Sequence, residues 1–273
     1  MSNTPLKHLL IVGLVLATAA CGHTPSRLGV RLDEVGVTKT RIGPAPADLD
    51  SRRYLPGSST RLKRADLLGD RNAEQLVEMP NGGGVEIRDQ SGAVINTVRT
   101  SDYLTDFGSV PAGSTPGAGT SKQLLVLYTY PNKQKGGTFQ VLNAALEQIA
   151  TWDELPPAGS FSTGEWRRQP ALFYLQGDTV VIRSPAGTRL QELRAPEGSI
   201  FRDVFVQTLP RDRTVVLASG SGYTQYHMVC VYDGTRLVFQ EVSNDLAYGV
   251  ESADDESGFV VTARDGRWKY TLK

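Results

Sequence analysis

The stretch Glu74–Thr100, EQLVEMPNGGGVEIRDQSGAVINTVRT, decides the fold of this chain. It contains short runs rich in Val, Ile and Leu, and each run is separated from the next by a glycine-containing turn. Short apolar runs bounded by Gly, Asn and Asp predict β-strands joined by tight turns. The stretch is therefore expected to form neighbouring antiparallel strands.

The same order of strand, turn and strand recurs along the rest of the chain. The first strands of the successive units start near Gln75, Gln123, Pro170, Thr214 and Gly258. The units therefore follow each other at intervals of 44 to 48 residues. A regular period of this length in an all-β chain indicates the blades of a β-propeller. We expect a propeller of about five blades over residues 61–273, with a β-sandwich or an open meander as the alternative.

Two segments need a separate interpretation. The sequence FQVLNAALEQIATW has modest helical character, but its halves are short and its neighbours are strands, so two strands joined near Asn143 are predicted. The last unit is incomplete and needs an outside strand. We expect Leu28–Val37 or the segment around Tyr54 to supply this strand and close the ring, since closure removes open sheet edges.

One unit carries a more specific resemblance. The sequence ADLLGDRNAEQLVEM resembles the FG-GAP or VCBS repeat, in which an acidic loop leads into a hydrophobic strand of a propeller blade. The resemblance implies calcium ligands at Asp66, Asp70 and Glu74. However, Leu68 replaces a central Asp and Arg71 adds positive charge, whereas calcium requires many oxygen ligands. We therefore predict no metal here, but a turn in which polar side chains cap backbone groups.

The amino terminus has the features of an export signal. Lys7 is followed by the apolar run Leu9–Ala20, and Cys21 comes directly after it. This run is far shorter than the roughly 20 residues of a membrane-spanning helix, but it matches a signal-peptide hydrophobic region. The small residues before Cys21 resemble the lipobox of bacterial lipoproteins, although Thr18 stands where Leu is usual. An ordinary secretory leader is the alternative.

The lipobox resemblance implies a location and a covalent anchor. It implies that residues 1–20 are a signal peptide, that cleavage occurs before Cys21, and that this cysteine is acylated and held in a lipid bilayer. Residues 21–60 are then a polar tether. Because Gly22 follows the cysteine instead of an Asp, the resemblance favours the outer membrane facing the periplasm.

Composition and motifs exclude several function classes. Lysine plus arginine and aspartate plus glutamate each number 29, so no basic field is present to attract nucleic acid. Cys230 lies in an alternating apolar stretch and is predicted to be a buried, inert thiol. The only histidines after the leader are His23 and His227, and the sequence around Ser221 does not form a nucleophile elbow. No cofactor or catalytic residue is predicted.

We therefore expect a lipid-anchored envelope protein that is a non-enzymatic binding or scaffold module. Its partner would be another envelope protein or a polysaccharide. The candidate contacts are tyrosines in the two longest loops, namely Tyr128, Tyr130, Tyr223 and Tyr226. The alternatives are a glycan-acting hydrolase or lyase with carboxylates at one end of the propeller channel, and a calcium-dependent adhesion module.

Overall fold

The computed structural model describes residues 32–46, 61–70, 72–132, 136–155, 158, 161–177, 179–194, 203–220 and 226–273. The predictions for the signal peptide, for Cys21 and for a strand around Tyr54 lie outside these residues. Within the described ranges, no helix is long and apolar enough to cross a membrane.

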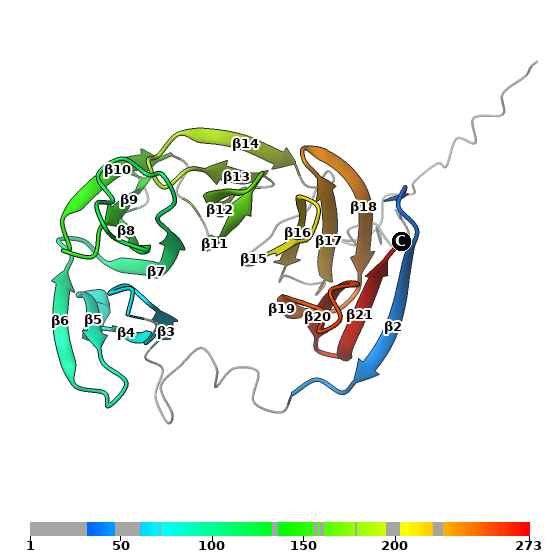
Figure 1. Cartoon of the computed structure of the whole chain (residues 1–273), viewed down its shortest axis with the longest axis horizontal. Helices are drawn as coiled ribbons and strands as arrows, with labels where there is room; N and C mark the ends of the chain where they lie inside the picture. Colours follow the sequence, from blue (N-terminus) through cyan, green and yellow to red (C-terminus); the bar gives the residue numbers. More distant parts are fainter. Residues whose placement is uncertain are drawn as a thin grey trace, which may run out of the picture.

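The described chain consists of β-strands and one short 3-10 turn at Pro80–Gly82, and the strands form five sheets (Figure 1). The first sheet contains β3 (Leu62–Ala65), β4 (Glu74–Glu78), β5 (Gly84–Arg88) and β6 (Val94–Arg99). The second contains β7 (Leu104–Pro111), β8 (Gln123–Asn132), β9 (Gly136–Leu142) and β10 (Gln148–Glu154). The third contains β11 (Phe161–Trp166), β12 (Gln169–Gln176), β13 (Thr179–Arg183) and β14 (Arg189–Arg194).

The last two sheets also recruit strands from the beginning of the chain. The fourth contains β15 (Asp203–Leu209), β16 (Arg213–Gly220), β17 (Tyr226–Asp233) and β18 (Arg236–Ser243), with β1 (Leu32–Asp33) added at its edge. The fifth contains β19 (Ala247–Ser252), β20 (Gly258–Ala263), β21 (Gly266–Leu272) and β2 (Val37–Gly43). The all-β, propeller-like fold of five sheets is confirmed. The segment around Asn143 does form two strands, β9 and β10.

The outside strand of the last unit is β2, which pairs antiparallel with β21 so that Val37 lies opposite Leu272. It begins at the last residue of the expected stretch Leu28–Val37 and continues beyond it. The strand inside that stretch, β1, pairs instead with β18 in the fourth sheet. The amino-terminal segment thus contributes to two different sheets.

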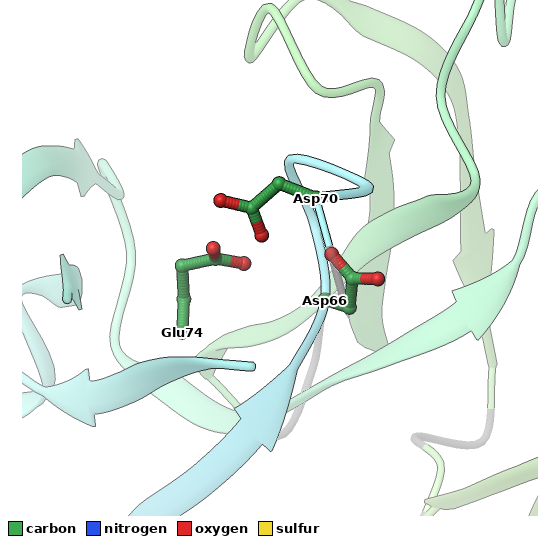
Figure 2. Close-up of side chains that lie close together, drawn as sticks. All are labelled: Asp66, Asp70 and Glu74. Carbon is green, nitrogen blue, oxygen red and sulfur yellow. The ribbon is translucent and has the colours of Figure 1, made fainter. Parts of the chain in front are cut away.

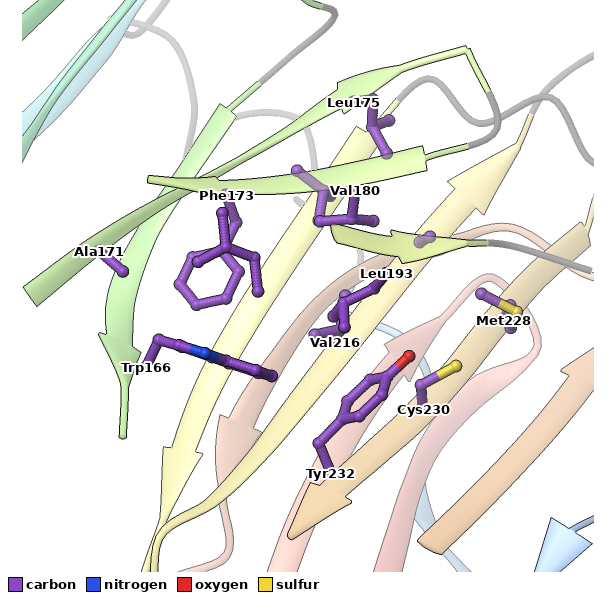
Figure 3. Close-up of a cluster of buried hydrophobic side chains, with 13 residues drawn as sticks. Trp166, Ala171, Phe173, Leu175, Val180, Leu193, Val216, Met228, Cys230 and Tyr232 are labelled. Carbon is purple, nitrogen blue, oxygen red and sulfur yellow. The ribbon is translucent and has the colours of Figure 1, made fainter. Parts of the chain in front are cut away.

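Four apolar clusters join the sheets in sequence order, because each cluster draws its side chains from two consecutive sheets. The cluster between the third and fourth sheets, for example, packs Trp166 and Phe173 against Val216, Cys230 and Tyr232 (Figure 3). Among the described residues, no such cluster joins the fifth sheet to the first. The expected outside strand of the last sheet is thus present as β2, but the predicted closed ring is not seen among these residues, and the five sheets form an arc (Figure 1).

The first sheet differs from the three sheets in the middle of the arc. Central strands of the middle sheets bury consecutive apolar residues, as in Leu124–Tyr128 and Ala171–Leu175, because both of their faces are covered. In the first sheet, Gln75 pairs with Arg64 and Arg88 on the face opposite the core residue Leu76. This outward face is polar, which is how terminal units of open repeat structures stay soluble.

The fourth strand of each sheet is paired irregularly. In all five sheets, the pairing between the third and fourth strands contains a register shift. An irregularity of this kind increases the local twist and interrupts the row of unpaired backbone groups, so it disfavours edge-to-edge pairing with another molecule.

Candidate functional site

An open cavity of about 700 Å³ lies where the innermost strands of four sheets meet. Strands β3, β7, β11 and β15 surround the centre of the arc in Figure 1 and provide its walls. The polar side chains that line it are Arg61, Lys63, Arg64, Thr105, Asp106, Ser109, Ser162, Thr163 and Asp203. The volume is that of a ligand-binding pocket. We call this feature the hub cavity.

Asp106 organises one wall of the hub cavity. It is 8% exposed, and it accepts hydrogen bonds from the backbone N–H groups of Phe107 (2.9 Å) and Phe161 (3.4 Å). Its carboxylate also lies 2.9 Å from Lys63 Nζ and 3.5 Å from Arg61 Nη1. Since Phe161 belongs to the third sheet and Lys63 to the first, this single carboxylate connects three sheets. Its charge is fully compensated by these donors.

The three basic residues of the hub cavity differ in how much freedom they have. Arg61 forms a bidentate ion pair with Glu78 at 2.9 Å and donates to backbone carbonyls of β7. Each of its three guanidinium nitrogens therefore already donates a hydrogen bond within the protein. Lys63 packs its ammonium over the rings of Phe107 (5.4 Å) and Phe161 (5.2 Å), but its side chain is still 39% exposed. Arg64 is exposed. Lys63 and Arg64 therefore offer accessible cationic groups, and the carboxylates of Asp106 and Asp203 line the same cavity.

A glycine on β7 creates the space beside Lys63. A Cβ atom at Gly108 would lie 3.4 Å from the Phe161 ring and 3.8 Å from Lys63 Nζ. A larger side chain at this position would therefore compete with the lysine for the same volume. The sequence gives no local sign of this role, because Gly108 lies in a strand and the groups that it accommodates come from other sheets.

Two of the four predicted contact tyrosines lie in the same strand. The placement of Tyr128 in a loop was wrong: it lies in β8, is completely buried, and its ring lies 4.5 Å from that of Phe139 in a tilted arrangement. Tyr130 also lies in β8 and is half-buried. Tyr226 is the first residue of β17, and Tyr223 lies outside the described residues. For these three, a role in partner binding stays a prediction.

The acidic loop of the first unit brings its three carboxylates together. One oxygen each of Asp66, Asp70 and Glu74 lies within 4.8 Å of the others (Figure 2). An all-oxygen group of this size suits a hard cation. However, Glu74 is committed to the backbone N–H of Leu67 at 2.7 Å, and Lys122 Nζ donates to the loop carbonyl of Gly69 at 2.8 Å.

The chain thus supplies positive charge to this loop from its own lysine. Asp70 has a pKa below its usual value because the backbone and side-chain amides of Asn72 donate to it, and the charge of Lys122 contributes in the same direction. In this turn, the carboxylates of Asp70 and Glu74 are satisfied by contacts within the chain. Because the turn lacks a central Asp, its carboxylates do not match the ligand set of a calcium loop. The absence of a metal ion here stays a prediction.

The two residues with nucleophilic or acid–base potential are packed into the core. Cys230 is fully buried, and burial raises the pKa of its thiol to about 12. His227 is 3% exposed, and burial lowers the pKa of its imidazole, whose Nδ1 lies 2.7 Å from the backbone oxygen of Asp245. Neither lines the hub cavity.

Comparison with known proteins identifies the class of fold. No protein-family model matches the chain, and no curated protein matches it. Among solved structures, it is similar to BBS1N in complex with ARL6DN, with a TM-score of 0.53 and 12% identity over 80% of this chain and 67% of that one. It is also similar to the Dos1 propeller, with a TM-score of 0.50 and 14% identity over 77% of this chain and 53% of that one.

The fold is thus that of a β-propeller protein, in agreement with the strand order and the five sheets. At such low identity, the likeness shows the fold alone. The chain spans about half the length of the Dos1 propeller and two thirds of the BBS1N chain.

Proposed function

We propose that this protein is a lipid-anchored lipoprotein of the bacterial outer membrane that faces the periplasm and binds a partner without catalysing a reaction. The export signal ending at Cys21 supports the location, and the propeller fold supports a binding or scaffold role. The observation that carries the binding role is the hub cavity, whose polar groups are fixed by rigid strands from four sheets. The partner is an envelope protein or polysaccharide.

The anchor is tested by measuring the intact mass of the protein extracted from membranes, alongside a Cys21→Ser variant. We expect the wild-type chain to begin at Cys21 and to carry acyl groups, and the variant to lack them. A wild-type chain that begins elsewhere, or that carries no lipid, would refute the proposed anchor. Binding is tested by cross-linking in intact cells through a photoreactive residue placed at Ser162 on the cavity wall, with Ser91 as an exposed control position.

A glycan-acting hydrolase is the second candidate, because Asp106 and Asp203 both line the hub cavity. Glycoside hydrolysis uses two carboxyl groups, one as acid and one as base or nucleophile. Asp106 already accepts from two backbone N–H groups and faces Lys63 and Arg61, so its role is structural. The binding function therefore ranks first. Release of reducing ends from an envelope polysaccharide, abolished by Asp203→Asn, would reverse this ranking.

A further inference from the structure

We propose that the hub cavity binds an acidic polysaccharide, recognising the carboxylate of a sugar unit through Lys63 and Arg64. This inference rests on the proposed binding function and names its ligand class. It depends on three features of the cavity: the charge that remains accessible, the hydroxyl groups around it, and the aromatic surface beside them.

The accessible cations of the cavity lie beside two acidic residues, Asp106 and Asp203. The side chain of Asp106 is 11% exposed and lies beneath Lys63, whereas the Lys63 side chain is 39% exposed. Asp106 and the two phenylalanine rings hold the ammonium in place before any ligand arrives. A pre-positioned ammonium loses little side-chain entropy on binding. Little of the favourable free energy of its contact with a carboxylate is therefore offset by ordering of the side chain. Arg64, which lies on the opposite face of the same innermost strand, is exposed and also lines the cavity.

The remaining polar groups suit a ligand with many hydroxyls. Ser109, Ser162 and Thr163 line the cavity from β7 and β11, and each hydroxyl can both donate and accept. Asp203 on β15 provides an acceptor for a sugar hydroxyl.

Aromatic surface completes the match to a sugar ring. Phe161 and Phe205 line the cavity from the third and fourth sheets. Sugar rings present apolar C–H groups on their faces and hydroxyls at their edges, which corresponds to a wall with both phenylalanines and hydroxyl side chains. An acidic peptide would use the same cations but would leave the hydroxyl groups with fewer partners. The lining therefore favours a carboxylated sugar over a peptide.

The test measures binding of defined probes to the full-length lipoprotein in detergent micelles by isothermal titration calorimetry. The probes are hexagalacturonate, neutral maltohexaose and a hexaglutamate peptide. We expect hexagalacturonate to bind and maltohexaose to bind more weakly. Added salt should lower the affinity for hexagalacturonate, because salt screens charge pairing. Lys63→Gln and Arg64→Gln should each lower the affinity for hexagalacturonate by about tenfold or more, since a charge-assisted contact is lost.

Arg189→Gln is the matched control, because Arg189 is an exposed arginine of β14 that does not line the cavity, and it should leave affinity unchanged. Melting temperatures of all variants report whether the fold is kept, and Arg64→Gln is the informative variant if Lys63→Gln unfolds. Equal binding by wild type and Arg64→Gln would overturn the proposal, as would no binding of hexagalacturonate. Preferential binding of hexaglutamate would also overturn it, while leaving the binding-module function in place.

Discussion

Lys39 Nζ lies 2.5 Å from Glu241 Oε1, although 202 residues separate them. The pair joins β2, the outside strand of the fifth sheet, to β18 of the fourth. The same ammonium lies over the rings of Trp268 (4.8 Å) and Tyr270 (5.2 Å), and Tyr270 Oη is 3.1 Å from Glu241. One lysine near the start of the chain therefore holds its carboxyl-terminal sheet in place.

Replacing this lysine should destabilise the protein. Lys39→Met removes the partner of a carboxylate whose side chain is only 16% exposed, and we expect unfolding free energy to fall by about 1 to 2 kcal/mol. The control is Arg236→Met, which breaks the more exposed pair with Glu34 and should change stability by less than about 0.5 kcal/mol. Urea unfolding measures both, and equal losses would contradict the special role of Lys39.

Stability should fall in mildly acidic solution because of His227. Burial lowers the pKa of this imidazole below its ordinary 6.5, so the unfolded chain takes up a proton first as the pH falls. The contribution of the neutral imidazole is thus complete above about pH 6.5 and is lost below it. The charges that face it are Lys39, Asp245 and Glu241. In His227→Asn, unfolding free energy between about pH 7 and pH 5 should vary less; an unchanged slope would refute this account.

Cys230 should be unreactive in the folded protein. Its thiol is buried between the third and fourth sheets, and burial raises its pKa to about 12, so almost no thiolate is present at pH 8. We expect iodoacetamide to label Cys230 only after unfolding in guanidinium chloride, as measured by intact mass. Because the folded thiol stays neutral while the unfolded thiol ionises from about pH 9, stability should also fall as the pH rises above that value. Rapid labelling of the native protein would contradict this prediction.

Calcium should leave the melting temperature unchanged. The acidic loop has Leu68 at a central position, and Lys122 brings its charge to the loop carbonyl of Gly69. Any ligand that binds the folded state alone would raise the melting temperature, so differential scanning fluorimetry with millimolar calcium or with chelator is a direct measurement. A calcium-dependent rise that disappears in Asp70→Asn would show that the three carboxylates hold the ion.

The polar end of the first sheet should keep molecules from stacking on one another. Glu86 and Arg88 form an ion pair of 2.5 Å on adjacent outward-facing positions of β5. Replacing both with valine creates an apolar sheet face, and we expect association that increases with concentration in sedimentation velocity. The control double variant replaces the exposed pair Arg236 and Glu34 with valine, which should associate less. Equal association would argue against a capping role.

The loop placement predicted for Tyr128 is wrong, and the sequence itself contains the reason. Leu124–Tyr128 is an unbroken apolar run, which is typical of a strand buried on both faces. The same rule distinguishes the middle sheets from the first sheet, since β5 alternates apolar and charged residues. These patterns are visible in the sequence, but whether both faces of a strand are covered depends on which sheets pack beside it.

The hub cavity offered no comparable local pattern. Lys63, Asp106, Phe161 and Asp203 belong to four different units, and each stands in an innermost strand with ordinary neighbours in sequence. Their meeting point depends on how consecutive sheets pack, and a period in the chain does not specify that packing. The sequence therefore predicts partner contacts in the longest loops, whereas the polar groups of the cavity converge at the centre of the arc.

The sequence by itself determined the strands, the repeating unit and the burial of Cys230, because hydrophobic periodicity and turn residues act over a few neighbouring positions. Only the tertiary structure decided that no apolar cluster of the described residues joins the fifth sheet to the first, that β2 completes the last sheet, and that Lys63 pairs with Asp106. These relationships arise from packing between residues that lie far apart in the chain, and no local pattern encodes which of those residues meet.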